Sequence, residues 1–169
     1  MSIDTITLTR EESKNVESGK AITEHLQRQV ANAFILYANY KHYHWETYGP
    51  LFRDLHVLFD EFATAVLSTA DEFAERLRFR GEAPVFDFRQ MLDVSRLHPS
   101  IRGDTMREMV QEANRNVQLV IAEMRDAARV AGNDNDPGAV DLFSKTVQIH
   151  EKHEWFLREL LRQNDGLTK

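Results

Sequence analysis

Residues 51–81 read LFRDLHVLFDEFATAVLSTADEFAERLRFRG, and this stretch decides the fold. It contains no Pro, and no Gly before Gly81, and its apolar residues recur at spacings of three and four. That pattern predicts one long amphipathic helix. Its apolar stripe consists of Leu55, Leu58, Phe59, Phe62, Val66, Phe73 and Leu77. A helix with one such face has to bury it against other helices.

Four potential metal ligands lie on a second stripe of the same helix. With His56 as the origin of a helical wheel, Asp60 falls at ~40°, Asp71 at ~60° and Glu75 at ~100°. His56 and Asp71 are nevertheless ~22 Å apart along the axis, at ~1.5 Å per residue. One ion cannot be held by both within a single chain. If these residues act together, a second chain must supply half of the site.

The rest of the chain is organised as further helices. We expect a polar, flexible arm over residues 1–17 and one helical domain over residues 18–169. Long helices are predicted at about 21–45, 51–81, 104–130 and 139–162, with a short helix at 88–94 inside the loop that Pro84 and Pro99 punctuate. Four long helices joined by mostly short loops predict an all-α, antiparallel four-helix bundle, and no strand pattern is present.

Composition narrows the class of protein. The chain has 169 residues, no Cys and a formal charge of −6. The absence of Cys excludes disulfides and thiolate metal sites. No apolar run approaches the ~18 residues of a membrane span, and the first ten residues lack a secretory pattern, so we expect a soluble, cytoplasmic protein. The acidic balance disfavours nucleic-acid binding by the folded body.

His44 joins the candidate ligands across the connection at residues 49–50. It ends the first predicted helix and shares its inner stripe with Leu26, so we expect it to point inward and to meet His56 and Asp60. Imidazole with carboxylate and no thiolate suits Fe(II), Mn(II) or Zn(II). Structural histidines and solvated carboxylates remain alternatives to a metal site at this point.

Two chains that lie antiparallel across a twofold axis would complete the site. The histidine end of one helix would then face Asp71 and Glu75 of the other, and the symmetry would create two equivalent sites per dimer. Other metal patterns fail, because no His has a Glu three residues before it. His150 and His153 are one residue too close for a zinc-protease motif, and we interpret them as part of a solvated or salt-bridged helix face.

The residues that carry these features resemble the signature of the Dps proteins, the mini-ferritins that protect DNA in starved cells. The resemblance rests on His44-Trp45, Gly49, Phe52, Leu55-His56, Leu58-Phe59-Asp60, Asp71 and Ala74-Glu75-Arg76, with His150–Leu157 similar to the fourth-helix segment. It spans roughly residues 20–163. Arg80-Gly81-Glu82 stands where the family commonly has a double glycine.

The resemblance implies a hollow dodecamer with ferroxidase centres between subunits, where hydrogen peroxide oxidises Fe(II) and ferric mineral is stored inside. It implies that His44, His56 and Asp60 come from one subunit and Asp71 and Glu75 from its twofold mate. Zn²⁺ and other divalent ions are further candidate occupants. Trp45, beside the centre in such proteins, would take up stray oxidising equivalents, or else simply pack at the helix end.

Two further functional expectations follow from the resemblance. Acidic residues around the turn before the fourth helix line an iron pore in the family, which here points to Asp134, Asp136 and Asp141, although Asp136 before Pro137 also reads as a helix cap. DNA binding is the alternative function, with iron chemistry secondary. It is disfavoured because residues 1–20 carry only three basic residues against four acidic ones. A helical bundle without chemistry is the third hypothesis.

Overall fold

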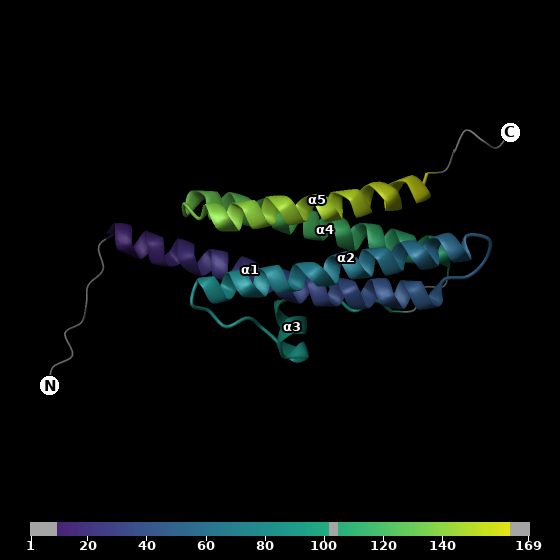
Figure 1. The fold of residues 1–169 in the computed structure, drawn as a ribbon, viewed down its shortest axis with the longest axis horizontal. Helices are drawn as coiled ribbons and strands as arrows, with labels where there is room; N and C mark the ends of the chain where they lie inside the picture. Colours follow the sequence, from purple (N-terminus) through teal and green to yellow (C-terminus); the bar gives the residue numbers. More distant parts are fainter. Residues whose placement is uncertain (1–9, 102–104, 163–169) are drawn as a thin grey trace.

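The computed structural model describes residues 10–101 and 105–162 as an all-helical bundle. Four long helices, α1 (Arg10–Glu46), α2 (Phe52–Phe79), α4 (Met106–Asn133) and α5 (Pro137–Leu160), are joined by a short α3 (Phe88–Val94) in the middle loop. Figure 1 shows α1 beside α2, α4 beside α5, and α3 outside the first pair. The described ranges contain no strand. The predicted fold class is confirmed.

The helix bounds agree with the prediction except at the N-terminus. The short helix lies at 88–94, as predicted. α1, in contrast, begins at Arg10, inside the predicted arm of residues 1–17. Residues 10–18 contain no Gly or Pro, so nothing in this polar stretch ends the helix. The remainder of that predicted arm, residues 1–9, lies outside the described part of the chain.

Side-chain caps mark the starts of α4 and α5, and a glycine lies in the turn between α1 and α2. Thr105 and Glu108 form a reciprocal capping box at the start of α4, in which each side chain accepts a hydrogen bond from the other's backbone N–H. The Asp136 side chain caps α5 by accepting from the Ala139 N–H at 2.9 Å. Gly49 adopts a φ of 81° in the α1–α2 turn, a conformation that glycine reaches without strain.

The core is continuous along the bundle and rich in aromatic rings. The largest fully buried side chains include Tyr40, Tyr43, Phe59, Phe73 and Phe143, which come from α1, α2 and α5. Tyr40 packs on Phe59 and Phe62 with ring centroids 6.1 and 5.5 Å apart. No helix of the described residues is both long and apolar enough to cross a membrane.

His150 and His153 are buried in this core, so their interpretation as a solvated helix face was wrong. They are 1% and 4% exposed. The His153 ring stacks on Phe62 at a centroid distance of 3.8 Å and meets His150 edge-on at 5.9 Å. Burial lowers the pKa of His150 to about 4. Burial, with smaller effects of His150 and Lys152, lowers the pKa of His153 to about 3, so both rings are neutral at neutral pH.

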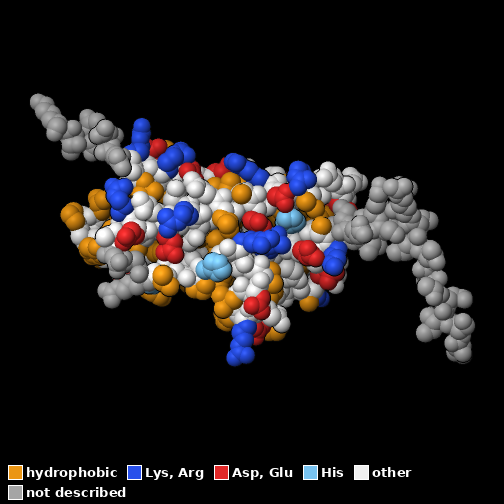
Figure 2. All heavy atoms as spheres, turned by 180° about the vertical axis from the view of Figure 1, so that it is seen from behind, with side chains coloured by type: hydrophobic (Ala, Val, Ile, Leu, Met, Phe, Trp, Pro, Cys, Tyr) orange, Lys and Arg blue, Asp and Glu red, His pale blue; other side chains and the backbone are white. Residues whose placement is uncertain are grey.

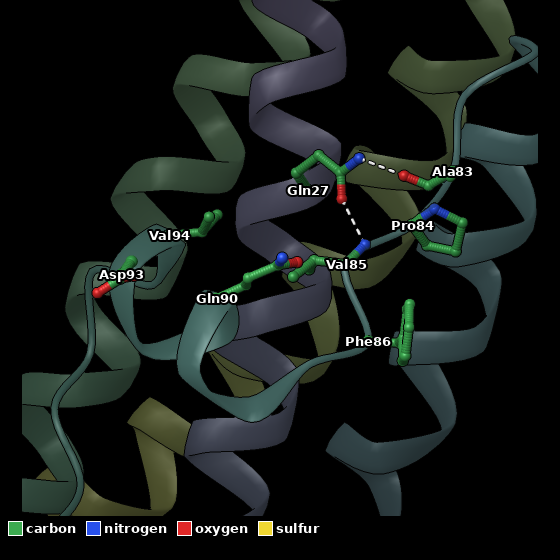
Figure 3. Close-up of a pocket in the computed structure, with 8 residues that line it drawn as sticks. All are labelled: Gln27, Ala83, Pro84, Val85, Phe86, Gln90, Asp93 and Val94. Carbon is green, nitrogen blue, oxygen red and sulfur yellow. Dashed lines mark hydrogen bonds between the residues drawn. The ribbon is translucent and has the colours of Figure 1, made fainter.

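Side-chain amides of α1 fasten the long loop between α2 and α4. Gln27 donates to the Ala83 carbonyl at 2.6 Å and accepts from the Val85 N–H at 2.7 Å, as Figure 3 shows. Further along α1, Asn32 accepts from the Ser95 hydroxyl and the Arg96 N–H, and Asn39 donates to the His98 carbonyl and accepts from the Ser100 N–H. The loop thereby lies along α1, and α3 packs against α1.

Replacing one of these amides should destabilise the fold. Asn39→Ala removes two hydrogen bonds and leaves the backbone groups of His98 and Ser100 without their partner, which should lower the free energy of unfolding by about 2 kcal/mol. Urea unfolding at fixed chain concentration measures the change. Gln148→Ala, which removes an exposed bond within α5, is the matched control and should change little. Equal effects of both would contradict the anchoring role of Asn39.

The buried histidines should make the fold sensitive to acid. Their folded-state pKa values lie below the ordinary value of about 6.5, so the folded state binds fewer protons than the unfolded state. The contribution of each histidine to stability is therefore complete above about pH 6.5. It falls by about 1.4 kcal/mol per pH unit below that value, down to about pH 4 for His150 and about pH 3 for His153. His150→Leu should lose part of that slope in urea unfolding. An unchanged slope would show that His150 does not titrate with unfolding.

Candidate metal centre

His44 and His56 face each other across the α1–α2 turn and are held by reciprocal hydrogen bonds. The Nδ1 atom of His44 lies 2.6 Å from the His56 carbonyl oxygen, and the Nδ1 atom of His56 lies 2.9 Å from the His44 carbonyl oxygen. The two half-buried rings stack with centroids 3.7 Å apart. His44 thus lies at the edge of the bundle and contacts α2, while its neighbour Tyr43 is the residue that enters the core.

These bonds determine which nitrogen is available for a metal. A carbonyl oxygen only accepts, so each Nδ1 has to carry a hydrogen and donate it. The Nε2 atom of each neutral ring then keeps its lone pair. A histidine that donates one N–H to a backbone carbonyl and offers the other nitrogen is the common arrangement of metal-bound imidazole. Phe52 stacks on His56 at 5.1 Å and restricts its ring further.

Asp60 supplies a carboxylate one helical turn after His56. Its side chain is exposed and accepts a hydrogen bond from Lys41 Nζ at 2.6 Å. This bond with Lys41 is the main cause that lowers the pKa of Asp60, and the charges of Lys41, His44 and His56 add to it. The carboxylate is therefore ionised at neutral pH, and Lys41 occupies one of its oxygens.

Trp45 is exposed beside this group of ligands. Its side chain is 69% accessible, and Lys41 Nζ lies 5.8 Å from its ring centroid. A single lysine thus contacts both the carboxylate and the indole. In the described chain the indole is open to solvent, so the alternative in which Trp45 simply packs at the helix end has no support within one subunit.

Asp71 and Glu75 lie exposed further along α2, apart from the histidines. Asp71 borders a hollow of about 420 Å³ between α2 and the middle loop, whose other lining residues include Phe34, Leu67, Phe86 and Phe88. Among the described residues, neither carboxylate forms a hydrogen bond or an ion pair. Both therefore remain free to bind a ligand that the chain itself does not provide.

No three His, Asp or Glu side chains of the described residues converge closely enough to hold a metal ion. His44 and His56 are in contact at one end of α2 with Asp60 one turn further on, whereas Asp71 and Glu75 lie near the other end. This separation agrees with the axial distance calculated from the sequence. The shared site stays a prediction, because its second half has to come from another chain.

The three predicted pore residues differ in their surroundings. Asp136 is buried and pairs with both Arg76 and Arg80, the latter at 2.6 Å, in addition to capping α5. Burial alone would raise the pKa of Asp136, but the Ala139 N–H and the two arginines hold it below its usual value. Asp134 lies 4.0 Å from Arg80, and Asp141 is exposed. Asp136 is therefore a structural residue whose charge is compensated, as its position before Pro137 suggested.

The contact between Arg76 and Asp136 explains why a glycine, Gly138, stands at the start of α5. A Cβ atom on Gly138 would lie 2.7 Å from the Arg76 guanidinium. Glycine thus leaves the space in which the arginine reaches Asp136. This ion pair joins the end of α2, next to Glu75, to the start of α5.

Comparison with known proteins places these features in a family. The model of the ferritin-like domain matches residues 23–166. The DNA protection during starvation protein 2 of Bacillus anthracis is 31% identical over 144 residues, which cover 85% of this chain and 99% of that protein. A second relative, the DNA protection during starvation protein 1 of Deinococcus radiodurans, is 30% identical over 84% of this chain and 69% of its own length.

Solved structures agree with the sequence comparison. The Dps structure from Thermosynechococcus elongatus superposes with a TM-score of 0.88 at 42% identity, covering 92% of this chain and 99% of that one. Dps from Staphylococcus aureus gives a TM-score of 0.82 at 29% identity, covering 85% and 96%. Sequence and fold agree over most of both chains, and this protein therefore belongs to the Dps family of ferritin-like proteins.

Proposed function

We propose that this protein is an iron-oxidising and iron-storing mini-ferritin whose ferroxidase centres are shared between two subunits. The observation that carries the proposal is the reciprocal hydrogen bonding of His44 and His56, which leaves two Nε2 lone pairs beside the ionised Asp60. Asp71 and Glu75, unpaired within the described chain, are the carboxylates that a twofold-related subunit would add. Imidazole and carboxylate together suit Fe(II), and such a site also accepts Zn²⁺.

The proposed reaction couples two iron ions to one peroxide. Each Fe(II) gives one electron, the O–O bond of hydrogen peroxide breaks, and its two oxygen atoms leave as water after taking up two protons. No hydroxyl radical is released when both electrons reach the same peroxide. Asp60, Asp71 and Glu75 compensate the growing positive charge of the metal, which then hydrolyses and adds to ferric mineral inside a hollow dodecamer. Trp45 would take up stray oxidising equivalents.

Iron would reach the cavity through acidic pores at threefold axes. Asp134 and Asp141 are the residues that we propose for this role, since Asp136 is neutralised by Arg76 and Arg80. Asp141 and Asp136 border a hollow of about 370 Å³ at the start of α5, together with Gly132, Asn135, Pro137, Val140 and Ser144. Negative charge at such an opening would raise the local concentration of cations.

Protection of DNA, the role in the relatives' names, would then be indirect here. The chain carries a formal charge of −6. On the face in Figure 2, the basic and acidic side chains are interspersed, with no positive stripe of the kind that follows a phosphate backbone. We therefore propose that removal of Fe(II) and peroxide, rather than coating of the duplex, is the protective activity.

Mixed assemblies test the shared site. His56→Ala and Glu75→Ala chains should each lose ferrous oxidation by hydrogen peroxide, measured anaerobically as ferric absorbance. When equal amounts are unfolded and reassembled together, half the dimers are hybrids with one intact site of two. The mixture should therefore regain about a quarter of the wild-type activity. A site contained in one chain predicts no recovery at all.

A doubly substituted chain provides the matched control. When His56→Ala/Glu75→Ala chains are mixed equally with wild-type chains, every hybrid dimer has two broken sites. A shared site predicts about a quarter of the wild-type activity, whereas a site within one chain predicts about half. The inter-subunit centre is refuted if the first mixture recovers no activity and the second keeps about half, while the assemblies keep their size.

Lys41 should compete with the metal for Asp60. Lys41→Met removes the ion pair and one positive charge near the ligands, so the variant should bind Co(II), a spectroscopic substitute for Fe(II), about two- to fivefold more tightly in a titration. Lys145→Met, which breaks the exposed Lys145–Glu72 pair between α5 and α2, is the control and should bind as the wild type. Weaker binding by Lys41→Met would instead mean that Lys41 orients the carboxylate for the ion.

A further inference from the structure

The bundle core contains a group of polar side chains whose hydrogen-bonding atoms have no partner. His150 Nδ1 and Nε2, His153 Nδ1 and the Tyr40 hydroxyl are all buried without a hydrogen bond. The three residues, here named the core histidine cluster, are each at least nine-tenths buried. An unsatisfied buried polar atom costs about 1–3 kcal/mol, so such a cluster calls for a ligand that supplies the missing contacts.

The geometry of the core histidine cluster suits a single ion between two imidazoles. His150 and His153 are three residues apart on α5, and their ring centroids lie 5.9 Å apart. A metal ~2 Å from a ring nitrogen lies ~3 Å from the ring centre, so two rings that share an ion have centroids up to ~6 Å apart. The Tyr40 ring meets His153 edge-on with centroids 5.9 Å apart, and the Tyr40 hydroxyl is another of the buried atoms without a partner.

The charge of the surroundings limits which ion could be held. Phe62 covers one face of His153, and Tyr40 is itself enclosed by Phe59 and Phe62. The acidic neighbours on α5 are already paired, Glu151 with Arg125 and Glu154 with Arg158. The free energy of desolvating an ion grows with the square of its charge. For a divalent ion it is therefore about four times that of a monovalent ion of the same size.

We propose that His150 and His153 form a closed binding site for monovalent copper, Cu(I), inside each subunit, with the Tyr40 hydroxyl as an adjacent third donor. Imidazole is a good ligand for copper, and in a site without a carboxylate a single positive charge costs less to bury than a double one. Both imidazoles are neutral at neutral pH, which leaves their lone pairs available. The site is separate from the interface ligands and does not depend on the proposed iron chemistry.

Copper retention in an interface-deficient background tests the site. In His44→Ala/His56→Ala chains, anaerobic titration against a chromogenic Cu(I) chelator should leave about one Cu(I) per subunit on the folded protein. Adding His150→Leu or His153→Phe, the latter keeping a flat ring against Phe62, should abolish that retention. Adding His98→Leu, which removes an exposed histidine, should leave it unchanged. X-ray absorption of the copper-loaded background protein should show nitrogen ligands to Cu(I).

Several outcomes would overturn the proposal. If the background protein retains no Cu(I), either when loaded folded or when refolded with copper, the orphan atoms bind water instead. Equal retention in His150→Leu, His153→Phe and the background would place copper elsewhere. Retention of Zn(II) in place of Cu(I) would refute the charge argument. Circular dichroism of each variant shows whether the fold is intact, so loss of copper can be distinguished from unfolding.

Discussion

The two imidazole-to-carbonyl hydrogen bonds between His44 and His56 hold both the α1–α2 hairpin and the candidate metal ligands in place. They tie the last turn of α1 to the first turns of α2, so the register of that helix pair is set where the chain reverses. They also assign the hydrogen to Nδ1 in both rings. The same two bonds therefore close the α1–α2 hairpin and leave the Nε2 lone pairs of both rings available. A change that disturbs one of these roles also disturbs the other.

At the opposite end of α2, ion pairs rather than histidine hydrogen bonds join the helices. Arg76 and Arg80 converge on Asp136, which also caps α5, and Gly138 leaves room for the guanidinium. α2 is thus anchored to α1 through the histidines at one end and to α5 through ions at the other. Glu75 and Asp71 lie between these anchors on a helix that is held at both ends, which keeps their positions on its surface defined without contacts of their own.

Much of this could be read from the sequence, and the differences have physical causes. Apolar periodicity and prolines located the helices and the short α3, and the axial rise alone separated His56 from Asp71. His150 and His153 were wrongly placed on a solvated face because the buried residues of α5 follow the helical period but are partly polar; they are Ala139, Phe143, Thr146, His150, His153 and Leu157. The partners of Asp60 and Asp136 were missed because Lys41, Arg76 and Arg80 reach them across helices, which a single-helix pattern does not record.

The hydrogen bonds from α1 to the loop between α2 and α4 are made mostly with the loop's backbone. Gln27, Asn32 and Asn39 bind carbonyl oxygens and N–H groups of Ala83, Val85, Arg96, His98 and Ser100, and the Ser95 hydroxyl is the exception. Every residue except proline offers the same N–H and C=O. Much of the information that shapes this crossover therefore resides in α1. The loop's own side chains add to it, because Met91 and Leu97 are buried while Arg96 and Ser100 contact Glu123 and Glu112 of α4.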